Sequence, residues 1–337
     1  MTTRFGDLHK LPTDKRDFSH HKHSGTLLAG QLPTQDFTLY DELQYSVKWG
    51  DTLSSIATRY GYTLAELVLA NNISNPNRIK TGQVLKLPAR QKIILNQEDL
   101  DFCFAFAGAE VQQLLYGVHA DPLYIASQVK KLRGEYTQFG ASLRDIAREL
   151  VKAGSIPQII APYTHNKRLP TDRDRNFLAN WANWPTGLDK TAFKYKDLSY
   201  FNVDGPNDFF DNIRSALWLN RFERRAVLIG LEWHGEWTYA PNGIIPPAMP
   251  ISSGGGHAMA IVGQKRIGGV DYSIFQQTWG DLMGDSGYYY LPRSIVNEIG
   301  SLGYGTYTVS RINKSGIVGS AVMDLLRLLG YKLGITK

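Results

Sequence analysis

The chain has 337 residues, of which 43% are hydrophobic and 20% are charged, and it contains 14 Phe, 18 Tyr and 7 Trp. This composition is typical of a globular protein and excludes a mostly disordered or collagen-like chain. The single cysteine excludes an internal disulfide and a zinc site built from several cysteines. The length favours one large domain together with a small one.

The net charge is +6, and the lysines and arginines are scattered among acidic residues without a long basic run. We therefore expect no nucleic-acid partner and only a mild preference for anionic surroundings such as a bacterial wall. The first ten residues contain no apolar run, and no stretch reaches the ~20 apolar residues of a membrane span. This pattern predicts a protein made in the cytoplasm without a signal peptide. It would act after lysis, in a virion or secreted particle, or at the bacterial cell wall.

Residues 1–44 are rich in Pro, Asp, His and Thr, which predicts an extended, turn-rich segment. The short run His20 to His23 contains three histidines and one lysine. Its spacing is not the i,i+4 pair of a helical metal site, so we interpret it as an exposed loop. The sequence predicts neither a metal site nor a cofactor.

Residues 45–88 are expected to form a self-contained unit in the order strand, helix, helix, strand. The segments YSVK and VLKL alternate like short strands, and the residues between them show two apolar helical faces. Gly61 is expected to end the first helix, and Thr63 is expected to cap the second. A polar loop rich in asparagine follows the second helix.

This unit resembles the LysM module almost from end to end. The matching signals are V-x-x-G-D-T-L, I-A-x-x-Y-G, L-x-x-A-N-N and G-Q-x-L-x-L-P. The resemblance implies binding to glycans that contain N-acetylglucosamine, such as peptidoglycan or chitin, in a groove between two loops. The implied glycan-binding residues are Gly50, Asp51, Thr52, Leu53, Ile73, Asn75, Pro76 and Asn77. The alternative is a LysM fold that serves as a structural or protein-contact module.

The remaining residues, 89–337, are expected to form one large domain. Helical periodicity and capping residues come first, and strand-like segments follow. Helices are expected at 103–117, 121–132, 142–153 and 206–220, with an irregular, aromatic-rich stretch at 155–205 and strands at 226–233, 257–264, 272–279, 287–291 and 305–312. Helices followed by strands indicate an α+β fold.

Five residues of this domain carry the candidate chemistry. Cys103 begins a helix, where backbone N–H groups and the helix dipole stabilise a thiolate. Gln97, six positions upstream, could donate to an oxyanion beside the Cys103 N–H. His257 opens an apolar strand after three glycines, which are expected to leave open space beside the imidazole. Gln277 could orient that imidazole, and the indole of Trp279 could shield their hydrogen bond from water.

These blocks, in this order and spacing, resemble the papain-like cysteine peptidases of bacterial and phage type. The family pattern is Gln-Gly-x-x-x-x-Cys-Trp-Ala-Phe-Ala, then Gly-His-Ala-x-x-x-Val-Gly, then Asn-Ser-Trp-Gly. The resemblance implies that Cys103 is the nucleophile and His257 is the general base and acid. It also implies that Gln97 is the oxyanion donor and that Trp279 covers the dyad.

The resemblance also implies the architecture. We expect a papain-like two-lobed α+β fold, with a helical lobe, a β-barrel-like lobe and a small βααβ LysM domain inserted near the N-terminus. In this division, residues 1–44 belong to the peptidase domain, 45–88 are the LysM module, and 89–337 complete the peptidase domain. The amphipathic segment SAVMDLLRLLGYKLG at the end is expected to be a helix that packs on the domain or docks a partner.

The sequence departs from the family pattern around the candidate site. Gln277 stands where the family has Asn, so its amide lies one methylene further out. Glu98 replaces the Gly that follows the oxyanion glutamine. The carboxylates of Asp99 and Asp101 would raise the pKa of the Cys103 thiol unless they are turned away.

Two further motifs are interpreted as structural. Glu232, His234 and Glu236 alternate, which would place them on one face of a strand; we expect an exposed strand end near the cleft, not a metal site. Trp181 and Trp184 are interpreted as loop packing residues, not as a sugar-binding platform.

Three functions remain open from the sequence. The first is a peptidase that a LysM module brings to a wall glycan, with a protein or a peptidoglycan stem peptide as substrate. The second is a structural or assembly protein of a phage tail, baseplate or contractile injection particle, with activity retained or lost. The third is a transglutaminase- or amidase-like use of the same Cys-His pair.

Overall fold

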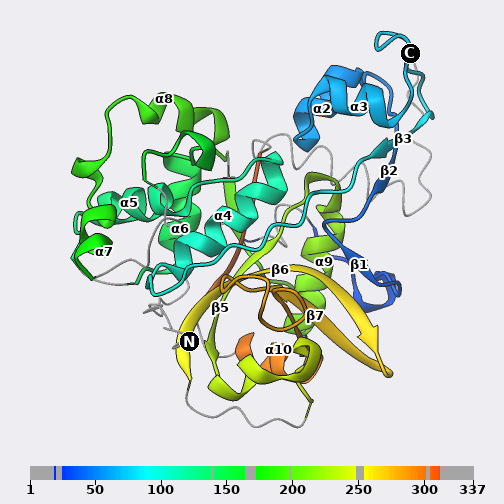
Figure 1. Cartoon of the computed structure of the whole chain (residues 1–337). Helices are drawn as coiled ribbons and strands as arrows, with labels where there is room; N and C mark the ends of the chain where they lie inside the picture. The colour runs from blue at the N-terminus through cyan, green and yellow to red at the C-terminus, as the bar shows by residue number, and fades with distance from the viewer. Residues whose placement is uncertain are drawn as a thin grey trace.

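The computed structural model describes residues 19, 25–137, 140–163, 172–197, 199–247, 254–300 and 304–311. Within them the chain forms a helical lobe, a lobe built on an antiparallel sheet, and a small two-helix domain beside them (Figure 1). The expected C-terminal helix and the segment His20 to His23 lie outside the described residues.

The small domain has the predicted order of elements. They are β2 (Leu43–Ser46), α2 (Leu53–Tyr60), α3 (Leu64–Ala70) and β3 (Val84–Leu87). The Thr52 hydroxyl accepts a hydrogen bond from the Ser55 N–H, and the Thr63 hydroxyl accepts one from the Glu66 N–H, so both helices begin at capped residues. Gly61 ends α2 in the left-handed conformation, as the sequence predicted.

The helical lobe contains five α-helices and the short 3-10 turns between them. Its elements are α4 (Cys103–Tyr116), α5 (Pro122–Arg133), α6 (Leu143–Lys152), η2 (Gln158–Ile160), α7 (Asp172–Ala179), η4 (Trp181–Asn183), α8 (Leu188–Ala192) and η5 (Phe193–Tyr195). The prediction of an irregular stretch at 155–205 was therefore wrong for α7, α8 and strand β4. Their short lengths and tertiary packing leave little periodicity for sequence analysis to detect.

The sheet lobe is an antiparallel sheet with strand order β4-β9-β5-β6-β7-β8, and β1 pairs with β6. Its strands are β1 (Phe37–Thr38), β4 (Ser199–Asn202), β5 (Val227–Trp233), β6 (Gly255–Ile267), β7 (Val270–Gln276), β8 (Tyr288–Pro292) and β9 (Thr306–Ser310). Its helices and turns are η1 (Ala29–Gln31), α9 (Phe209–Leu219), η6 (Arg221–Glu223), η7 (Gly235–Tyr239), η8 (Pro241–Gly243) and α10 (Arg293–Gly300).

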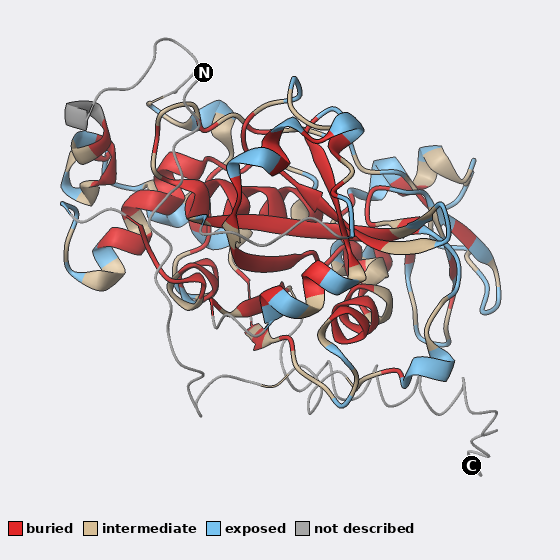
Figure 2. Cartoon of the chain, turned by 90° about the horizontal axis from the view of Figure 1, so that it is seen from below, coloured by how far each residue is buried: buried red, intermediate tan, exposed pale blue. Residues whose placement is uncertain are grey.

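The two lobes meet where α4 packs against β6. Every residue of α4 from Cys103 to Leu115 is buried, and so is the β6 segment from His257 to Gln264 (Figure 2). The helix is thus covered on all sides, including its polar residues Glu110, Gln112 and Gln113. Helix α4 therefore holds its N-terminus at a fixed place beside the sheet.

The small domain is held against both lobes by hydrogen bonds from two arginines. Buried Arg224 donates to the carbonyl oxygens of Leu39 and Pro88 and to the Tyr62 hydroxyl. Arg90 donates to the Gly61 carbonyl at 2.7 Å. Leu39 lies before the inserted domain and Pro88 lies at its end, so these hydrogen bonds hold the chain at both ends of the insertion.

Gly61 lies close to the helical lobe. A Cβ atom at this position would lie 2.2 Å from the Leu115 carbonyl oxygen at the end of α4. No side chain fits at such a distance, so the turn that ends α2 requires glycine for this packing as well as for its backbone angle.

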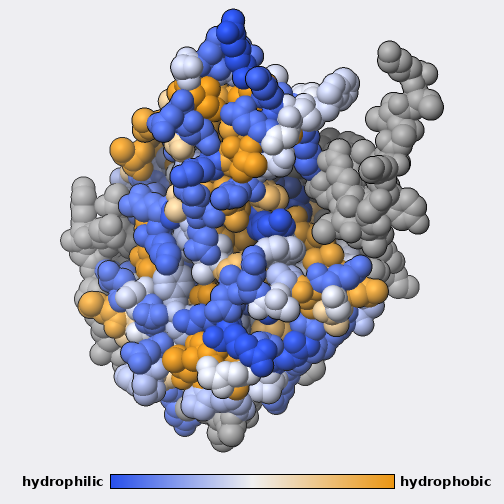
Figure 3. All heavy atoms as spheres, turned by 90° about the vertical axis from the view of Figure 1, so that its right-hand side faces the viewer, coloured by the Kyte–Doolittle hydropathy of each residue, from blue (hydrophilic) through white to orange (hydrophobic). Residues whose placement is uncertain are grey.

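No helix among the described residues is long and apolar enough to cross a membrane. The face that carries the small domain shows apolar side chains in small groups among hydrophilic ones (Figure 3).

Candidate active site

Cys103 is the first residue of α4. Phe102 is the N-cap residue, and its side chain makes no capping hydrogen bond. The first backbone N–H groups of the helix are therefore not bonded to a capping side chain. Cys103 is 1% exposed. The thiol therefore lies in the electropositive field of a 14-residue helix and out of bulk water.

The imidazole of His257 lies near the start of β6, where His257 pairs with Leu231 across the sheet. Its Nε2 lies 2.5 Å from Gln277 Oε1. The same oxygen accepts a hydrogen bond from the Thr278 N–H at 2.9 Å, which identifies it as the acceptor end of the amide. The Nε2 therefore carries the proton, and Nδ1 is the basic nitrogen.

His257 Nδ1 is buried and has no hydrogen-bond partner within the part of the chain that the structure describes. A buried acceptor without a partner is costly and rare, which marks this nitrogen as a position for a reacting proton. Burial lowers the pKa of the imidazole to about 4, and the hydrogen bond with Gln277 partly opposes that shift. The ring is therefore neutral at physiological pH until a nearby anion forms.

Trp279 stacks on His257, with ring centroids 4.8 Å apart and an angle of 22° between the planes. Trp233 packs edge-on against Trp279 at 5.6 Å. The two indole rings thus pack against the imidazole that bonds to Gln277. An apolar cover strengthens such a bond because it excludes water.

Gln97 is fully buried and bonded at both ends of its amide. Its Oε1 accepts a hydrogen bond from Thr278 Oγ1 at 2.5 Å, and its Nε2 donates one to the Leu100 carbonyl at 2.9 Å. The amide nitrogen has two hydrogens, so one remains for another acceptor. Its orientation is fixed by these two bonds.

Hydrogen bonds bring the three sequence blocks together. The Gln97 N–H donates to the Thr278 carbonyl at 2.7 Å, and Asn96 forms a bridge with Trp279. The loop that leads into Cys103 is thus tied to the segment whose glutamine bonds His257. Gln97, Cys103, His257 and Gln277 are each at most 1% exposed and Trp279 is 7% exposed, and helix α4, which begins at Cys103, packs against β6.

Glu98 stands where the family has glycine, and its φ is 51°. This left-handed conformation is uncommon for residues other than glycine. The backbone geometry therefore explains the glycine of the family pattern, and Glu98 adopts it at a cost of about 1 kcal/mol.

Asp101 does not stand as an isolated charge beside the thiol. Its Oδ2 accepts a hydrogen bond from Nη1 of Arg175 in α7, and the side chains are 15% and 5% exposed. The sequence analysis expected this carboxylate to raise the thiol pKa unless it is turned away; the structure pairs it instead with an arginine 74 positions away. Sequence spacing gave no signal for Arg175.

One expectation near the site was wrong, and a second was wrong for one of its three glycines. Strand β5 ends at Trp233, and the chain turns into η7, so Glu232, His234 and Glu236 do not form one exposed strand face; His234 is 1% exposed. A Cβ at Gly254 would lie 2.4 Å from the Trp233 carbonyl oxygen. That glycine therefore permits close backbone approach instead of leaving open space.

The structure describes no group of three or more His, Cys, Asp or Glu side chains that could hold a metal ion. Trp184 is 7% exposed and packs edge-on against Tyr124 and Tyr163, which confirms its interpretation as a packing residue. Trp181 is half-buried and packs edge-on against Tyr136.

The predicted glycan-binding residues lie on two loops of the small domain. In the first loop, Gly50 and Thr52 are exposed and Leu53 is buried. Asp51 accepts hydrogen bonds from the Lys48 N–H and the Tyr45 hydroxyl, so its carboxylate stabilises the loop from within.

In the second loop, Asn75 and Asn77 are exposed, while Ile73 and Pro76 are half-buried. The sequence analysis missed Trp49, which is 91% exposed directly before Gly50. An aromatic residue in a polar turn was the signal available for it.

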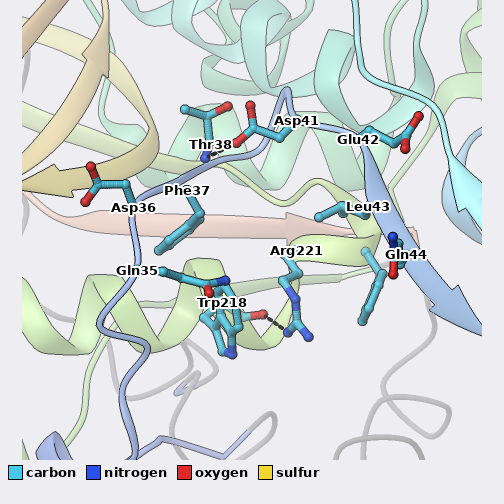
Figure 4. Close-up of a pocket in the computed structure, with 11 residues that line it drawn as sticks. Gln35, Asp36, Phe37, Thr38, Asp41, Glu42, Leu43, Gln44, Trp218 and Arg221 are labelled. Atoms are coloured by element: carbon cyan, nitrogen blue, oxygen red, sulfur yellow. Dashed lines mark hydrogen bonds between the residues drawn. The ribbon is translucent and has the colours of Figure 1, made fainter.

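A groove beside the small domain contains no candidate catalytic residue (Figure 4). It lies between residues 35–44 and the end of α9, and Trp218 and Arg221 line it. Arg221 stacks on Trp218, with its guanidinium carbon 4.1 Å from the ring centroid. The groove belongs to the packing between the domains.

Comparison with known protein families agrees with this architecture. The model described as LysM domain matches residues 45–88, and the model described as papain family cysteine protease matches residues 150–309. The second match includes His257, Gln277 and Trp279 and begins after Cys103.

Solved structures with the same fold include xylellain, a cysteine protease from Xylella fastidiosa. It is 17% identical, with a TM-score of 0.58, and the match covers 93% of this chain and 99% of xylellain. Digestive procathepsin L 3 of Tenebrio molitor larval midgut is 14% identical, with a TM-score of 0.50, and the match covers 65% of this chain and 66% of that chain. The large domain therefore has the papain-like α+β fold.

Curated relatives match each domain separately. N-acetylmuramoyl-L-alanine amidase XlyB of Bacillus subtilis (strain 168) is 53% identical over 45 residues, which are 13% of this chain and 14% of the amidase. A cysteine protease of Blomia tropicalis is 24% identical over 233 residues, 65% of this chain. The chain spans 62% of the length of that protease. The chain thus combines a LysM domain with a domain of the papain family of cysteine proteases.

Proposed function

We propose that this chain is a cysteine peptidase that hydrolyses peptide bonds through Cys103 and His257. The observation that carries the proposal is the hydrogen bond between His257 Nε2 and Gln277 beneath Trp279, with Nδ1 left as a buried acceptor. A base with this geometry could activate a cysteine at the N-terminus of α4, the helix that packs against β6.

The reaction begins with transfer of the Cys103 proton to His257 Nδ1, which gives a thiolate and an imidazolium. The negative thiolate compensates the desolvation that otherwise keeps the imidazole neutral. The sulfur attacks the carbonyl carbon of the scissile bond. The free N–H of Gln97 and the backbone N–H of Cys103 stabilise the oxyanion, and each well-placed donor contributes about 3 kcal/mol.

The imidazolium then donates its proton to the leaving amine, and the C–N bond breaks to give a thioester. Water attacks the thioester while His257 Nδ1 accepts its proton. The carboxylic acid leaves, and the proton returns to the Cys103 sulfur. Gln277 keeps the ring in one orientation through both halves of the reaction.

We further propose that the LysM domain binds a glycan that contains N-acetylglucosamine and brings the peptidase to the cell wall. The likeness of this domain to the LysM region of a muramoyl-alanine amidase supports peptidoglycan as that glycan. The substrate is then a wall-associated protein or the peptide stems of peptidoglycan.

The test is hydrolysis of a fluorogenic peptide library by the intact chain, by Cys103→Ser and by His257→Ala. We expect activity only in the unchanged chain, with all three proteins folded by circular dichroism. Sedimentation with insoluble peptidoglycan tests the LysM domain in the same preparations. Activity that survives in Cys103→Ser would contradict the mechanism.

A second candidate is an assembly role in a phage tail, baseplate or contractile injection particle, with the activity retained or lost. The tight packing of the LysM domain on the protease domain through Arg224 and Arg90 favours it, because a purely targeting module needs no such docking. A chain that remains an active monomer in solution would contradict this candidate.

A further inference from the structure

The ion pair between Asp101 and Arg175 lies two residues before the candidate nucleophile. It joins the loop that carries Gln97 to α7, while Thr278 bonds the other end of the loop at Gln97. Both side chains are largely shielded from solvent. In such surroundings charges interact more strongly than they do in water.

The charged and titratable groups around Cys103 come from several elements. Its own loop contributes Glu98, Asp99 and Asp101; β6 contributes His257, and α7 contributes Arg175. Three of these groups are acidic. An acidic residue just ahead of a helix N-terminus offsets the positive field that the helix end presents to the thiol.

We propose that Arg175 is a positioning residue that holds and neutralises Asp101, so that the Cys103 thiol ionises in the field of the α4 N-terminus. This inference rests on the proposed function, because it concerns the same nucleophile. Arg175 acts through its ion pair with Asp101. Asp101, the partner of Arg175, also stands at a position where the papain-like family has a neutral residue.

The same contact fixes the loop conformation. Arg175 pulls the Asp101 end of the loop, while Thr278 holds the Gln97 end. The oxyanion donor and the nucleophile therefore depend on one loop that is held from both lobes. Loss of the Arg175 charge would change the ionisation of the Cys103 thiol. A measurement of thiol ionisation separates this effect from a change in the stability of the fold.

The experiment measures the alkylation rate of Cys103 by iodoacetamide from pH 4 to 10 by intact mass. In Arg175→Ala we expect the midpoint of the rate profile to rise by about one pH unit, which is about tenfold slower labelling at pH values below both midpoints. The double variant Arg175→Ala/Asp101→Asn should restore the midpoint, because it removes the uncompensated carboxylate. Arg175→Lys should retain it.

Two further variants keep the test decisive. Asp101→Asn alone removes the carboxylate charge and keeps Arg175, so its midpoint should fall below that of the unchanged chain even if Arg175→Ala does not fold. Arg148→Ala removes an arginine that is 48% exposed on α6, and it should leave the profile unchanged.

The outcomes separate the two proposals. Suppose that the unchanged chain is active and its alkylation profile has a low midpoint. If Arg175→Ala or Asp101→Asn then leaves that midpoint unshifted, the inference about Arg175 is overturned and the proposed function is not. An unchanged chain that is inactive and labels only near the ordinary thiol pKa of about 8.5 overturns the proposed function as well.

Discussion

Tyr60 of the LysM domain packs against Phe222 of the protease domain, with ring centroids 6.0 Å apart. Tyr45 contacts the same ring edge-on at 5.6 Å. Phe222 belongs to η6 in sequence, yet it packs against the core of the LysM domain. A domain of this size buries little apolar surface by itself, so a ring supplied from outside adds to its stability.

Replacing this ring should loosen the LysM domain. We expect Phe222→Ala to lower the free energy of unfolding by about 2 kcal/mol, since the side chain is half-buried. Differential scanning calorimetry should show the LysM domain unfolding before the rest. Phe193→Ala, at a phenylalanine that is 69% exposed, is the matched control. Equal effects of the two substitutions would argue against the contact.

Relief of the backbone strain at Glu98 should stabilise the protein. Glycine adopts a φ of 51° without the steric cost that a Cβ imposes, so Glu98→Gly should raise the unfolding free energy by up to about 1 kcal/mol. Asp99→Gly in the same loop, where φ is not positive, should lower it. Thermal midpoints of the two variants should therefore shift in opposite directions.

Stability should depend on pH through buried carboxyl groups. Burial raises the pKa of Asp197 to about 8, above the value of about 3.9 for an unfolded chain. The folded state thus holds this proton more tightly, and the resulting stability is complete below about pH 4 and is lost as the pH rises through 8. Urea unfolding from pH 5 to 8 should show a falling free energy of unfolding.

The variant Asp197→Asn should flatten that pH dependence, because the amide does not ionise. Exposed Asp189→Asn is the control and should retain the slope. Other buried carboxyls with raised pKa values act in the same direction; they are Glu110, Asp121 and Glu149. A slope that is identical in both variants would show that Asp197 does not contribute.

The amide of Gln277 should matter for turnover. Gln277→Ala removes the hydrogen-bond partner of His257, and a hydrogen bond to a charged group is worth about 2 kcal/mol. We expect kcat to fall about thirtyfold with little change in KM, measured on a fluorogenic peptide. Gln128→Ala, at a half-buried glutamine on α5, should leave kcat unchanged. A change in KM alone would contradict an orienting role.

Trp49 should contribute to glycan binding. Its ring is 91% exposed beside the loop that contains Gly50 and Thr52, where it offers a flat apolar surface to a sugar ring. Trp49→Ala should weaken binding to insoluble peptidoglycan about fivefold in sedimentation assays. Leu69→Ala, at another exposed apolar residue of the domain, should not weaken it. Equal losses would indicate nonspecific adhesion.

Local chemistry made much of this fold predictable from the sequence. Thr63, Ser142 and Gly61 mark helix ends whose caps the structure contains. The papain-like fold and the LysM match agree with the resemblance that short motifs around Cys103 and His257 indicated. The assignment of catalytic roles to these residues stays a prediction.

Long-range contacts were not predictable. Arg175 meets Asp101 across 74 residues, and Arg224 contacts segments 136 to 185 positions away. A single sequence does not indicate which distant carboxylate or carbonyl group an arginine will contact. The burial of His234 was missed for a related reason, since the end of β5 depends on tertiary packing.

The LysM domain enters and leaves the protease through adjacent strands. Leu43 pairs with Leu87, so the two junctions of the inserted module lie about 5 Å apart. An insert with neighbouring ends leaves the host chain's path almost undisturbed, as a loop does. Another carbohydrate-binding cassette with similarly placed termini, and a hydrophobic recess for Phe222, could therefore be grafted at this point to direct the proposed peptidase to a different polymer.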